Sequence, residues 1–426
     1  MLNEFFNIYK EENMSELIKK PRGTLDYFLD GELALKGLRK CLMEIAETYG
    51  CKECELPMFE ENKLFHRTTG ESSDIVTKET FDLVSRGDKD YTLRPEFTAS
   101  VNRAVVENKF YNLPDMPLRI SYFGPVFRYE RPQAGRLRQF NQFGVEFLDS
   151  KVDLDCALDA FMLSIRSAEK ALNRPVMVKL NYLGSYQSRE NYKRELRRYF
   201  EPLVSTMCDD CKRRLETNPL RILDCKVPED HEIALKAPKI KDFLTEEDKK
   251  EYETLLKALD LMGVDYEIDD GLVRGLDYYT GLVWELYDKT NMNVGAIGGG
   301  GKYANLMAQI GGPDFEGIGF SLGVERLLLS LSEERKNELM DKKSLDLFII
   351  DNRRDGKALD LADKVRKLGK SVNICSFGRG MGGAFKMADR LKANKVLLVD
   401  QDKLQLKDMA SRSQTEITEE ELLKSF

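Results

Sequence analysis

The spacing of apolar residues predicts two long amphipathic helices in the first half of the chain. In the segment 31–49, apolar side chains recur every three or four residues, which places them on one stripe of a helix. They are Leu35, Leu38, Leu42, Ile45 and Tyr49. Gly50 follows directly and suits the left-handed position at which many helices end. The segment 153–172 has the same spacing and is predicted to form the second helix.

Strand patterns surround these helices and are then interrupted. Apolar runs predict strands in the ranges 91–94, 118–147, 176–183, 272–274, 282–287, 293–298 and 317–322. Between about 185 and 262 the chain is strongly charged and has the pattern of helices. Because strand patterns lie on both sides of this stretch, we interpret it as a helical insertion.

The pattern changes again after the charged connection 333–344. Strand-like segments then alternate with helical ones. The strands are expected at 345–351, 371–377 and 395–400, and the helices near 356–369 and 384–393. Such alternation is typical of a small parallel α/β domain.

Length and composition bound the domain organisation. A chain of 426 residues is too long for a typical single domain, so two or three domains are expected. The expected parts are a flexible leader (1–14), a first domain (15–335), a linker (336–344) and the α/β domain (345–426). The sequence has no apolar run long enough to cross a bilayer, and it has no signal peptide. It therefore predicts no membrane partner. The eight scattered cysteines fit a reducing cytoplasm.

The net charge of −7 argues against a non-specific nucleic-acid binder. Local clusters of Lys and Arg could still contact phosphate groups. They occur at 131–138, 194–198 and 212–214, and the last two are most simply explained as solvated helix faces.

The hairpin 124–147 carries charged residues inside two apolar strands. Alternation places Arg128 with Glu130 on one face, and Gln142 with Glu146 on one face of the returning strand. A buried charge costs several kcal/mol unless it is paired or meets a ligand. This face is therefore predicted to be the floor of a site for a polar ligand that carries both signs of charge. The alternative is a surface hairpin whose ions pair with each other.

Three further stretches carry candidate chemistry. Arg274, in the apolar stretch 272–285, suits bidentate anion binding, or it pairs with Asp277. The four consecutive glycines 298–301 could let a backbone approach a ligand closely, or they form a tight bend. Arg326 lies near the start of a helix, where a cation is unfavourable without an anion, so a phosphate partner would explain it.

Two other patterns have more ordinary explanations. The segment 378–383 (GRGMGG) has the layout of a dinucleotide fingerprint, but the surrounding α/β segment is too short for a dinucleotide fold, which favours a structural turn. Cys208, Cys211 and Cys225 with His231 could form a zinc site, but their spacing is loose, which favours free thiols. The sequence therefore predicts no metal ligands.

Taken together and in order, these stretches resemble the histidyl-tRNA synthetases, a family of class II aminoacyl-tRNA synthetases. FRYERPQAGRLRQFNQFGVEF (127–147) is similar to motif 2 of the class, and GFSLGVERLLL (319–329) is similar to motif 3. LVRGLDYYTG (272–281) is similar to the signature of the histidyl enzymes, and YTLRPEFTAS (91–100) to their amino-acid-binding stretch. The helix at 31–49 and the ELPMFE that follows it resemble motif 1, which forms a dimer interface in this class.

The resemblance implies an α+β fold: an antiparallel sheet flanked by helices, with a helical insertion and a C-terminal α/β domain similar to an anticodon-binding domain. It implies a histidine–tRNA ligase that joins histidine to ATP, releases pyrophosphate, and transfers histidine to the 3′ end of tRNA-His. Magnesium would accompany ATP. The implied partners are tRNA-His, L-histidine, ATP and a second copy of the chain in a homodimer.

Residue roles also follow from the resemblance. Arg128 would hold the α-phosphate, Glu130 would accept from the adenine amino group, and Arg136 and Arg326 would bind the outer phosphates. Arg274 corresponds to the catalytic arginine of the family, which contacts the carboxylate and the α-phosphate. The implied histidine-binding residues are Glu96, Thr98 and Gln142 at the α-ammonium group, Glu146 and Tyr279 at the imidazole, and Tyr278 and Tyr303 as pocket walls.

The chain departs from the family pattern at three places. Lys302 and Ala304 flank Tyr303 where the family usually has Arg and Asp, Asn141 stands where His is frequent, and the segment after Lys403 is short. The alternative function is a non-ligase regulatory paralogue that binds histidine and partners ATP phosphoribosyltransferase. Such paralogues tend to lack the RGLDYY signature and the anticodon-binding domain, and both patterns are present here.

Overall fold

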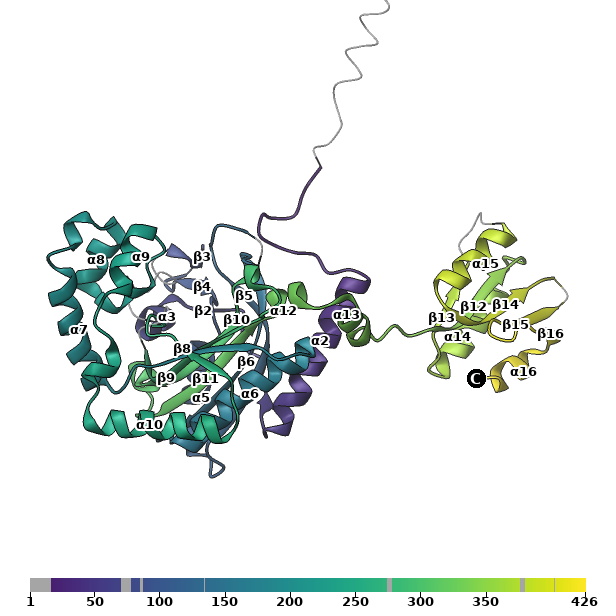
Figure 1. The fold of residues 1–426 in the computed structure, drawn as a ribbon. Coiled ribbons are helices and arrows are strands. Elements are labelled where there is room, and N and C mark those ends of the chain that lie inside the picture. Colours follow the sequence, from purple (N-terminus) through teal and green to yellow (C-terminus); the bar gives the residue numbers. More distant parts are fainter. Residues whose placement is uncertain are drawn as a thin grey trace, which may run out of the picture. The chain divides into compact units, whose positions relative to one another are not determined.

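The computed structural model describes residues 17–69, 78–84, 87–133, 135–273, 278–375, 380–401 and 403–426. These residues form two compact units, which divide between Met340 and Asp341 (Figure 1). The expected leader, 1–14, lies outside the described residues.

The first unit is built on an eight-stranded sheet. Across the sheet the strands are β1 (Lys52–Glu53), β5 (Leu118–Phe127), β6 (Gln139–Asp149), β11 (Glu316–Gly323), β10 (Ala296–Ala304), β9 (Tyr279–Tyr287), β7 (Met177–Tyr182) and β8 (Tyr266–Ile268). The strands from β5 to β7 pair antiparallel with their neighbours, whereas β1 and β8 at the two edges pair parallel. The sheet is thus mainly antiparallel, and with its helices it confirms the implied α+β fold.

Two long helices cover one face of this sheet. Helices α2 (Asp30–Thr48) and α6 (Leu154–Leu172) begin and end within one residue of their predicted limits, and they pack against each other. Asp153 caps α6 by accepting a hydrogen bond from the backbone N–H of Cys156 at 2.9 Å. Beneath α6, the buried Trp284 donates its Nε1–H to the hydroxyl of Ser164 at 2.9 Å, so the indole's polar atom is satisfied inside the core.

Alternation along β6 divides its side chains between the two faces of the sheet. Phe143, Val145 and Phe147 are fully buried in the core beneath the helices. Gln142 and Glu146 therefore point to the opposite face, as the sequence predicted. That opposite face carries the polar residues of the candidate site.

A smaller antiparallel sheet lies beside this polar face. It consists of β2 (Phe59–Glu61), β4 (Tyr91–Leu93) and β3 (Phe81–Leu83). Helices α3 (Asn62–Thr69) and α5 (Thr98–Glu107) pack against each other next to it. The prediction had missed β2 and β3, because strands of three residues are too short to display a period.

The remaining elements of the first unit are short. They are η1 (Phe110–Asn112), η5 (Met292–Val294), α11 (Leu306–Gln309), α12 (Val324–Ser330) and α13 (Glu333–Leu339). The prediction of a strand over 272–274 was wrong for Leu272 and Val273, which are in no strand, and the third residue lies outside the described part of the chain. Helix α13 occupies much of the connection that had been read as a charged linker.

The insertion is helical, as predicted. Its elements are α7 (Tyr186–Phe200), η2 (Val204–Thr206), α8 (Asp209–Thr217), η3 (Pro219–Asp224), α9 (Pro228–Leu235), η4 (Ile240–Phe243) and α10 (Glu246–Leu261). Asp248 of α10 accepts hydrogen bonds from the backbone N–H and the hydroxyl of Ser185 at 3.0 and 2.7 Å, and from the hydroxyl of Ser188. This buried carboxylate therefore ties the start of α7 to the start of α10.

The second unit contains a five-stranded sheet with helices. Its strands lie in the order β13 (Val372–Ile374), β12 (Leu345–Asp351), β14 (Ala393–Val399), β15 (Leu404–Asp408) and β16 (Gln414–Ile417). The first three are parallel, as predicted, but β15 and β16 add an antiparallel edge that had not been predicted. Its helices are α14 (Lys357–Lys367), α15 (Met381–Arg390) and α16 (Glu419–Lys424). Two clusters of buried apolar residues give this unit a core of its own.

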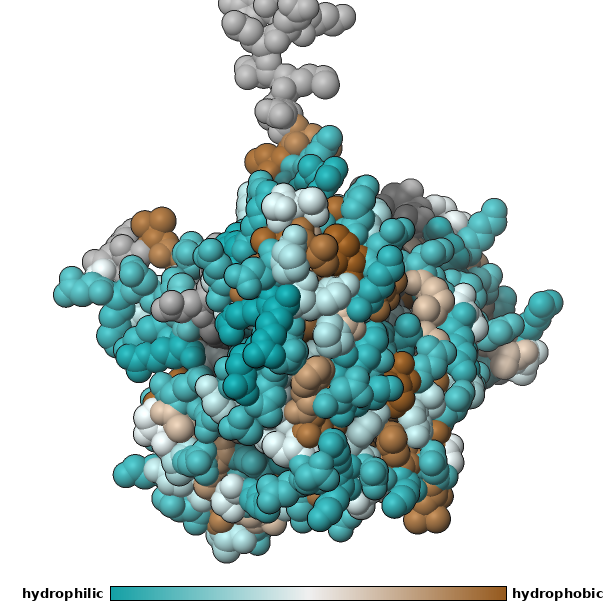
Figure 2. Space-filling view, turned by 60° about the vertical axis from the view of Figure 1, so that its left-hand side comes forward, coloured by the Kyte–Doolittle hydropathy of each residue, from teal (hydrophilic) through white to brown (hydrophobic). Residues whose placement is uncertain are grey.

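The surface is dominated by polar and charged residues. Figure 2 shows one mostly hydrophilic face on which hydrophobic residues are scattered in small groups. Among the described helices, none combines the length and the apolar character that a membrane span requires.

Candidate active site

The hairpin of β5 and β6 positions the first group of candidate residues. Arg128 and Glu130 follow the end of β5, so they belong to the connection and do not share a strand face as predicted. The backbone still holds Arg128 in place, because its N–H donates to the carbonyl oxygen of Arg138 at 2.9 Å. Its side-chain Nε donates to the carbonyl oxygen of Pro95, also at 2.9 Å, and the guanidinium lies 5.4 Å from the ring centre of Phe140.

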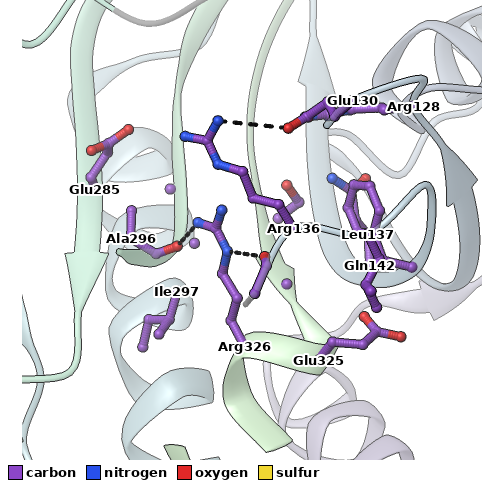
Figure 3. Close-up of a pocket in the computed structure, with 16 residues that line it drawn as sticks. Arg128, Glu130, Arg136, Leu137, Gln142, Glu285, Ala296, Ile297, Glu325 and Arg326 are labelled. Carbon is purple, nitrogen blue, oxygen red and sulfur yellow. Dashed lines mark hydrogen bonds and ion pairs between the residues drawn. The ribbon is translucent and has the colours of Figure 1, made fainter. Parts of the chain in front are cut away.

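Three arginines converge on one cavity of about 190 Å³ at this end of the hairpin (Figure 3). Arg128 and Arg136 come from the connection, and Arg326 comes from the first turn of α12. Arg326 donates from Nε to the carbonyl oxygen of Gly135 at 2.8 Å and from Nη1 to that of Ala296. Burial lowers the pKa of Arg326, and the charge of Arg136 lowers it further. Like charges held this close favour an anionic ligand.

Carboxylates and backbone complete the cavity wall. Glu130 forms an ion pair with Arg136 at 3.7 Å. Glu285 of β9 lies on the other side of Arg136 and Arg326 (Figure 3). Gly298 and Gly299 of β10 line the cavity between β9 and α12. The four glycines thus lie within a strand, not in a tight bend, although its pairing with β9 shifts register just before and just after them.

Glu325 connects the two motifs that carry these arginines. Its nearly buried carboxylate accepts hydrogen bonds from the backbone N–H of Asn141 at 2.9 and 3.0 Å and from its side-chain amide at 2.9 Å. It also accepts from the hydroxyl of Tyr27 at 2.8 Å. Burial raises the pKa of Glu325, and these donors offset part of that rise. Asn141, which departs from the usual family residue, therefore has a structural function here.

A second polar group lies further along β6, around Glu146. This carboxylate is only 1% exposed. It accepts from the hydroxyl of Thr98 at 2.7 Å, from that of Tyr303 at 2.8 Å and from that of Tyr122 at 3.3 Å. Burial raises the pKa of Glu146 from its ordinary value of 4.5 to about 8, although the hydroxyl donors favour the charged form. Such a site suits a ligand that brings hydrogen-bond donors or positive charge.

Glu96 lies at the start of α5 next to this group. Its two carboxylate oxygens accept from the backbone N–H groups of Thr98 at 2.6 Å and Ala99 at 2.8 Å, which satisfies the first donors of the helix. Burial raises the pKa of Glu96, while those N–H groups and the charge of Arg128 act in the opposite direction. Glu96 therefore connects the arginine cavity with the group around Glu146.

Three tyrosines lie together beside the group around Glu146. The ring of Tyr278 lies 4.7 Å from that of Tyr279 and 5.5 Å from that of Tyr303, centre to centre. Adjacent residues of a strand face opposite ways, but β9 begins only at Tyr279, so alternation does not apply to Tyr278. Burial raises the pKa of both Tyr278 and Tyr303, which keeps their hydroxyl groups neutral and able to donate.

Glycines in β10 and β11 make room for these side chains. A Cβ atom at Gly319 would overlap the carboxylate of Glu146, and one at Gly317 would overlap the ring of Tyr303. A Cβ atom at Gly301 would likewise overlap the ring of Tyr279. Close approach of side chains from neighbouring strands therefore explains these glycines.

The structure thus brings together most of the predicted site residues. The exception is Arg274, which lies outside the described residues. Sequence reasoning missed Tyr122 and Asn102, whose amide donates to the hydroxyl of Tyr303 at 3.2 Å. Tyr122 stands opposite Gly144 in the pairing of β5 with β6, so the register of the hairpin would have found it. Lys302, the other departure, donates to the carbonyl oxygen of Val152 at 2.8 Å and pairs with Glu316 at 3.0 Å.

Comparisons with known proteins agree with this geometry. Residues 30–327 match the family model described as histidyl-tRNA synthetase. The histidine–tRNA ligase of Bacillus subtilis (strain 168) is 41% identical over 415 residues, which are 95% of this chain and 97% of that protein. That of Staphylococcus carnosus (strain TM300) is 40% identical over 91% of this chain and 92% of its own length.

Solved structures give the same result for the fold. The crystal structure of apo S. aureus histidyl-tRNA synthetase superposes with a TM-score of 0.78 at 33% identity and covers 96% of this chain and 100% of its own. A Bacillus halodurans protein described as an ATP phosphoribosyltransferase regulatory subunit/histidyl-tRNA synthetase is 21% identical with a TM-score of 0.62 over 90% of this chain and 98% of its own, so it supports the fold alone. The match over nearly the whole chain places it in a family: this chain belongs to the histidyl-tRNA synthetases.

Proposed function

We propose that this chain is a histidine–tRNA ligase that activates histidine with ATP and transfers it to tRNA-His. The single observation that supports this best is the buried carboxylate of Glu146, surrounded by hydroxyl donors, on the strand that leads away from the three-arginine cavity. Histidine carries a ring that donates from one nitrogen and accepts or donates at the other. A buried carboxylate beside hydroxyl groups is suited to such a ring.

The cavity is proposed to bind ATP. Arg128 would hold the α-phosphate, Arg136 and Arg326 the outer phosphates, and Glu130 would accept from the adenine amino group. The convergence of three guanidinium groups supports this assignment, because Arg binds phosphate oxygens through paired N–H donors. Carboxylate oxygens are ligands that Mg²⁺ prefers, and Glu285 offers them on the wall, so the ion that accompanies ATP would neutralise phosphate charge there.

The pocket beyond the cavity is proposed to bind histidine. Glu96, Thr98 and Gln142 would take the α-ammonium group, while Glu146 and Tyr279 would bind the imidazole. Tyr278 and Tyr303 would form the walls. The burial of both carboxylates supports this assignment, because their present donors are neutral hydroxyl and backbone N–H groups, and the bound amino acid would add positive charge.

The reaction needs stabilisation of charge more than it needs a chemical group from the protein. The carboxylate of histidine attacks the α-phosphorus, and negative charge develops on the phosphoryl oxygens as pyrophosphate leaves. Arginines that are already fixed by backbone carbonyls, such as Arg128 and Arg326, would meet this charge without reorganising. Arg274 is proposed to contact both the carboxylate and the α-phosphate.

The other partners are proposals from the family. The second unit is proposed to bind the anticodon region of tRNA-His. A homodimer through the α2 region is proposed as well, and the apolar side chains of Phe28 and Leu29 at the start of α2, which are 74% and 85% exposed, support it. The eight cysteines carry free thiols, which supports a cytoplasmic location.

The proposal is tested by amino-acid-dependent ATP–pyrophosphate exchange with each of the twenty amino acids. We expect exchange with histidine alone. Exchange with another amino acid would contradict the assignment of Glu146. Histidine binding by calorimetry without any exchange would instead identify a regulatory paralogue.

The proposed role of Arg274 gives a sharper test. We expect Arg274→Ala to slow adenylate formation by about a hundredfold or more, because a fixed cation at the reacting phosphorus typically contributes about 3–4 kcal/mol. The far-ultraviolet circular dichroism and the melting temperature should stay unchanged. Exchange near the wild-type rate in the folded variant would refute the role of Arg274.

A further inference from the structure

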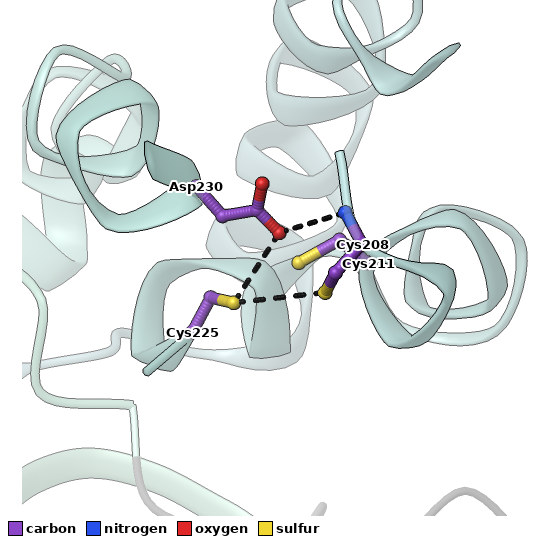
Figure 4. A group of neighbouring side chains, drawn as sticks. All are labelled: Cys208, Cys211, Cys225 and Asp230. Atoms are coloured by element: carbon purple, nitrogen blue, oxygen red, sulfur yellow. Dashed lines mark hydrogen bonds between the residues drawn. The ribbon is translucent and has the colours of Figure 1, made fainter. Parts of the chain in front are cut away.

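Three cysteines and one aspartate meet inside the insertion, away from the pocket described above (Figure 4). Cys208 is the N-cap residue of α8, and Cys211 lies in the first turn of the same helix. Cys225 follows the end of η3, and Asp230 lies in the first turn of α9. The cluster thus joins three segments that are separate in the chain.

The four side chains point toward a common centre. Their sulfur and carboxylate oxygen atoms all lie within 4.8 Å of one another. The Sγ atoms of Cys208 and Cys225 are 3.9 Å apart, and the Sγ of Cys225 is 3.5 Å from Oδ2 of Asp230. Zn–S bonds of 2.3 Å in a tetrahedron place two sulfur atoms about 3.7 Å apart. The observed separations therefore need little change to accept a tetrahedral ion.

The carboxylate of Asp230 is buried among these thiols and accepts from the Sγ of Cys225 at 3.5 Å, so it completes a set of four potential metal ligands. It is 2% exposed, and Oδ2 accepts from the backbone N–H of Cys208 at 3.0 Å. Within the described part of the chain, Asp230 forms no ion pair with a Lys or Arg side chain. A buried carboxylate without a cation is costly, and cations compensate it either as side chains or as metal ions.

We propose that Cys208, Cys211, Cys225 and Asp230 bind one Zn²⁺ ion as a structural site. Three thiolates and one carboxylate fill a tetrahedral shell, and a shell made only of protein ligands leaves no open position for a substrate. Binding releases the three thiol protons to solvent and changes no oxidation state. The sequence pattern had offered His231 as the fourth ligand, but that residue is exposed and the structure puts its neighbour Asp230 in the cluster.

The ion would stabilise the wall of a functional cavity. Leu220 and Arg221 of η3 line a cavity of about 540 Å³ together with Tyr278 and Tyr279 of the proposed histidine pocket. Segment η3 packs against both α8 and α9, which carry the proposed ligands. A metal ion that crosslinks these helices therefore restricts the movement of the segment that faces the tyrosines.

The test is the metal content of the full-length chain, purified without chelators and measured by elemental analysis. We expect about one zinc per chain, retained through dialysis. Replacement by Co²⁺ should give thiolate-to-cobalt charge-transfer bands and the strong visible absorption of tetrahedral cobalt. Cys211→Ser and Cys225→Ser should lower the zinc content to near zero, while Cys156→Ser, which removes a thiol far from the cluster in sequence and in the fold, should leave it unchanged.

A milder variant keeps the test valid if loss of a thiolate unfolds the insertion. Asp230→Asn retains an oxygen that can accept from Cys208 but removes the charge, so we expect zinc affinity to fall about tenfold or more with the helical content preserved. Two results would overturn the proposal: a reduced, folded wild-type chain that binds neither Zn²⁺ nor Co²⁺, or a Cys208–Cys225 disulfide in peptide maps of the native protein. Because none of these readouts uses the aminoacylation reaction, they stand apart from the test of the proposed function.

Discussion

At the scale of single residues, the proposed pocket depends on Glu146, a carboxylate in surroundings that disfavour its charge. Thr98, Tyr122 and Tyr303 supply hydroxyl donors, but burial still raises its pKa to about 8. The free protein therefore holds this group largely protonated near neutral pH. A ligand with donor nitrogens would make the ionised form favourable, so the proposed binding of histidine would be coupled to the loss of this proton.

The first residue-scale prediction concerns the substitution Glu146→Gln. The amide keeps the shape of the side chain but removes the charge that would face the imidazole. Because a hydrogen bond to a charged group contributes about 1.5–3 kcal/mol, we expect kcat/KM for histidine in exchange to fall by about ten- to a hundredfold. The KM for ATP should change little. An unchanged kcat/KM for histidine would show that Glu146 does not contact the ring.

A second prediction follows from the raised pKa of Glu146. Its value in the folded state lies above that in the unfolded chain, so its contribution to stability is complete below about pH 4.5 and is lost as the pH rises through about 8. The free energy of unfolding of Glu146→Gln should therefore improve relative to wild type across this window, by at most roughly 5 kcal/mol. Urea unfolding at a series of pH values measures this difference.

At the scale of elements, the long helices could be predicted and the details of the sheet could not. Helices α2 and α6 have several turns of regular apolar spacing, which identifies both their type and their limits. The charged positions of the β5–β6 hairpin predicted a ligand site, and the structure places Arg128, Glu130 and Gln142 at one cavity. Pairing between distant segments sets the strand register and decides where each strand begins and ends. It therefore also decides that Arg128 lies beyond its strand and that Tyr278 can contact Tyr279. A single sequence does not encode such pairing locally.

The element-scale prediction concerns the packing of β11 against β6. Gly319→Ala would place a methyl group on the carboxylate of Glu146, so strand and side chain would have to move apart. We expect a loss of about 1–3 kcal/mol in unfolding free energy together with loss of histidine-dependent exchange. Gly31→Ala is a matched control, because no atom lies near its added methyl group at the start of α2. A fully active, stable Gly319→Ala variant would show that the pocket is less closely packed than described.

At the scale of the whole molecule, the chain divides between Met340 and Asp341, and every described residue of the proposed active site belongs to the first unit. The second unit has its own parallel strands, antiparallel edge and apolar clusters. Alternating strands and helices predicted its centre, whereas β15 and β16 span only five and four residues, which is too short to display a clear period.

This division predicts separate effects on the two steps of the reaction. A chain that ends at Met340 should retain histidine-dependent exchange within about threefold of the full chain, because activation needs only the first unit. Transfer to tRNA-His should fall by at least about tenfold, since contacts with the second unit would be lost. The test measures ATP–pyrophosphate exchange and tRNA charging for the full chain and for the chain that ends at Met340. Unimpaired charging by the shorter chain would rule out tRNA binding by the second unit.

The glycines of the central strands also limit how such a protein can evolve. Gly301, Gly317 and Gly319 each lie directly against one side chain of the proposed histidine pocket. A mutation at any of them would displace a side chain that is proposed to contact histidine before it could create room or polarity for a different amino acid. A change of substrate would therefore require paired mutations through an inactive intermediate, and a chain that every translated gene depends on cannot pass through that intermediate. Fidelity toward histidine is in this sense protected by backbone packing as much as by the groups that bind the ring.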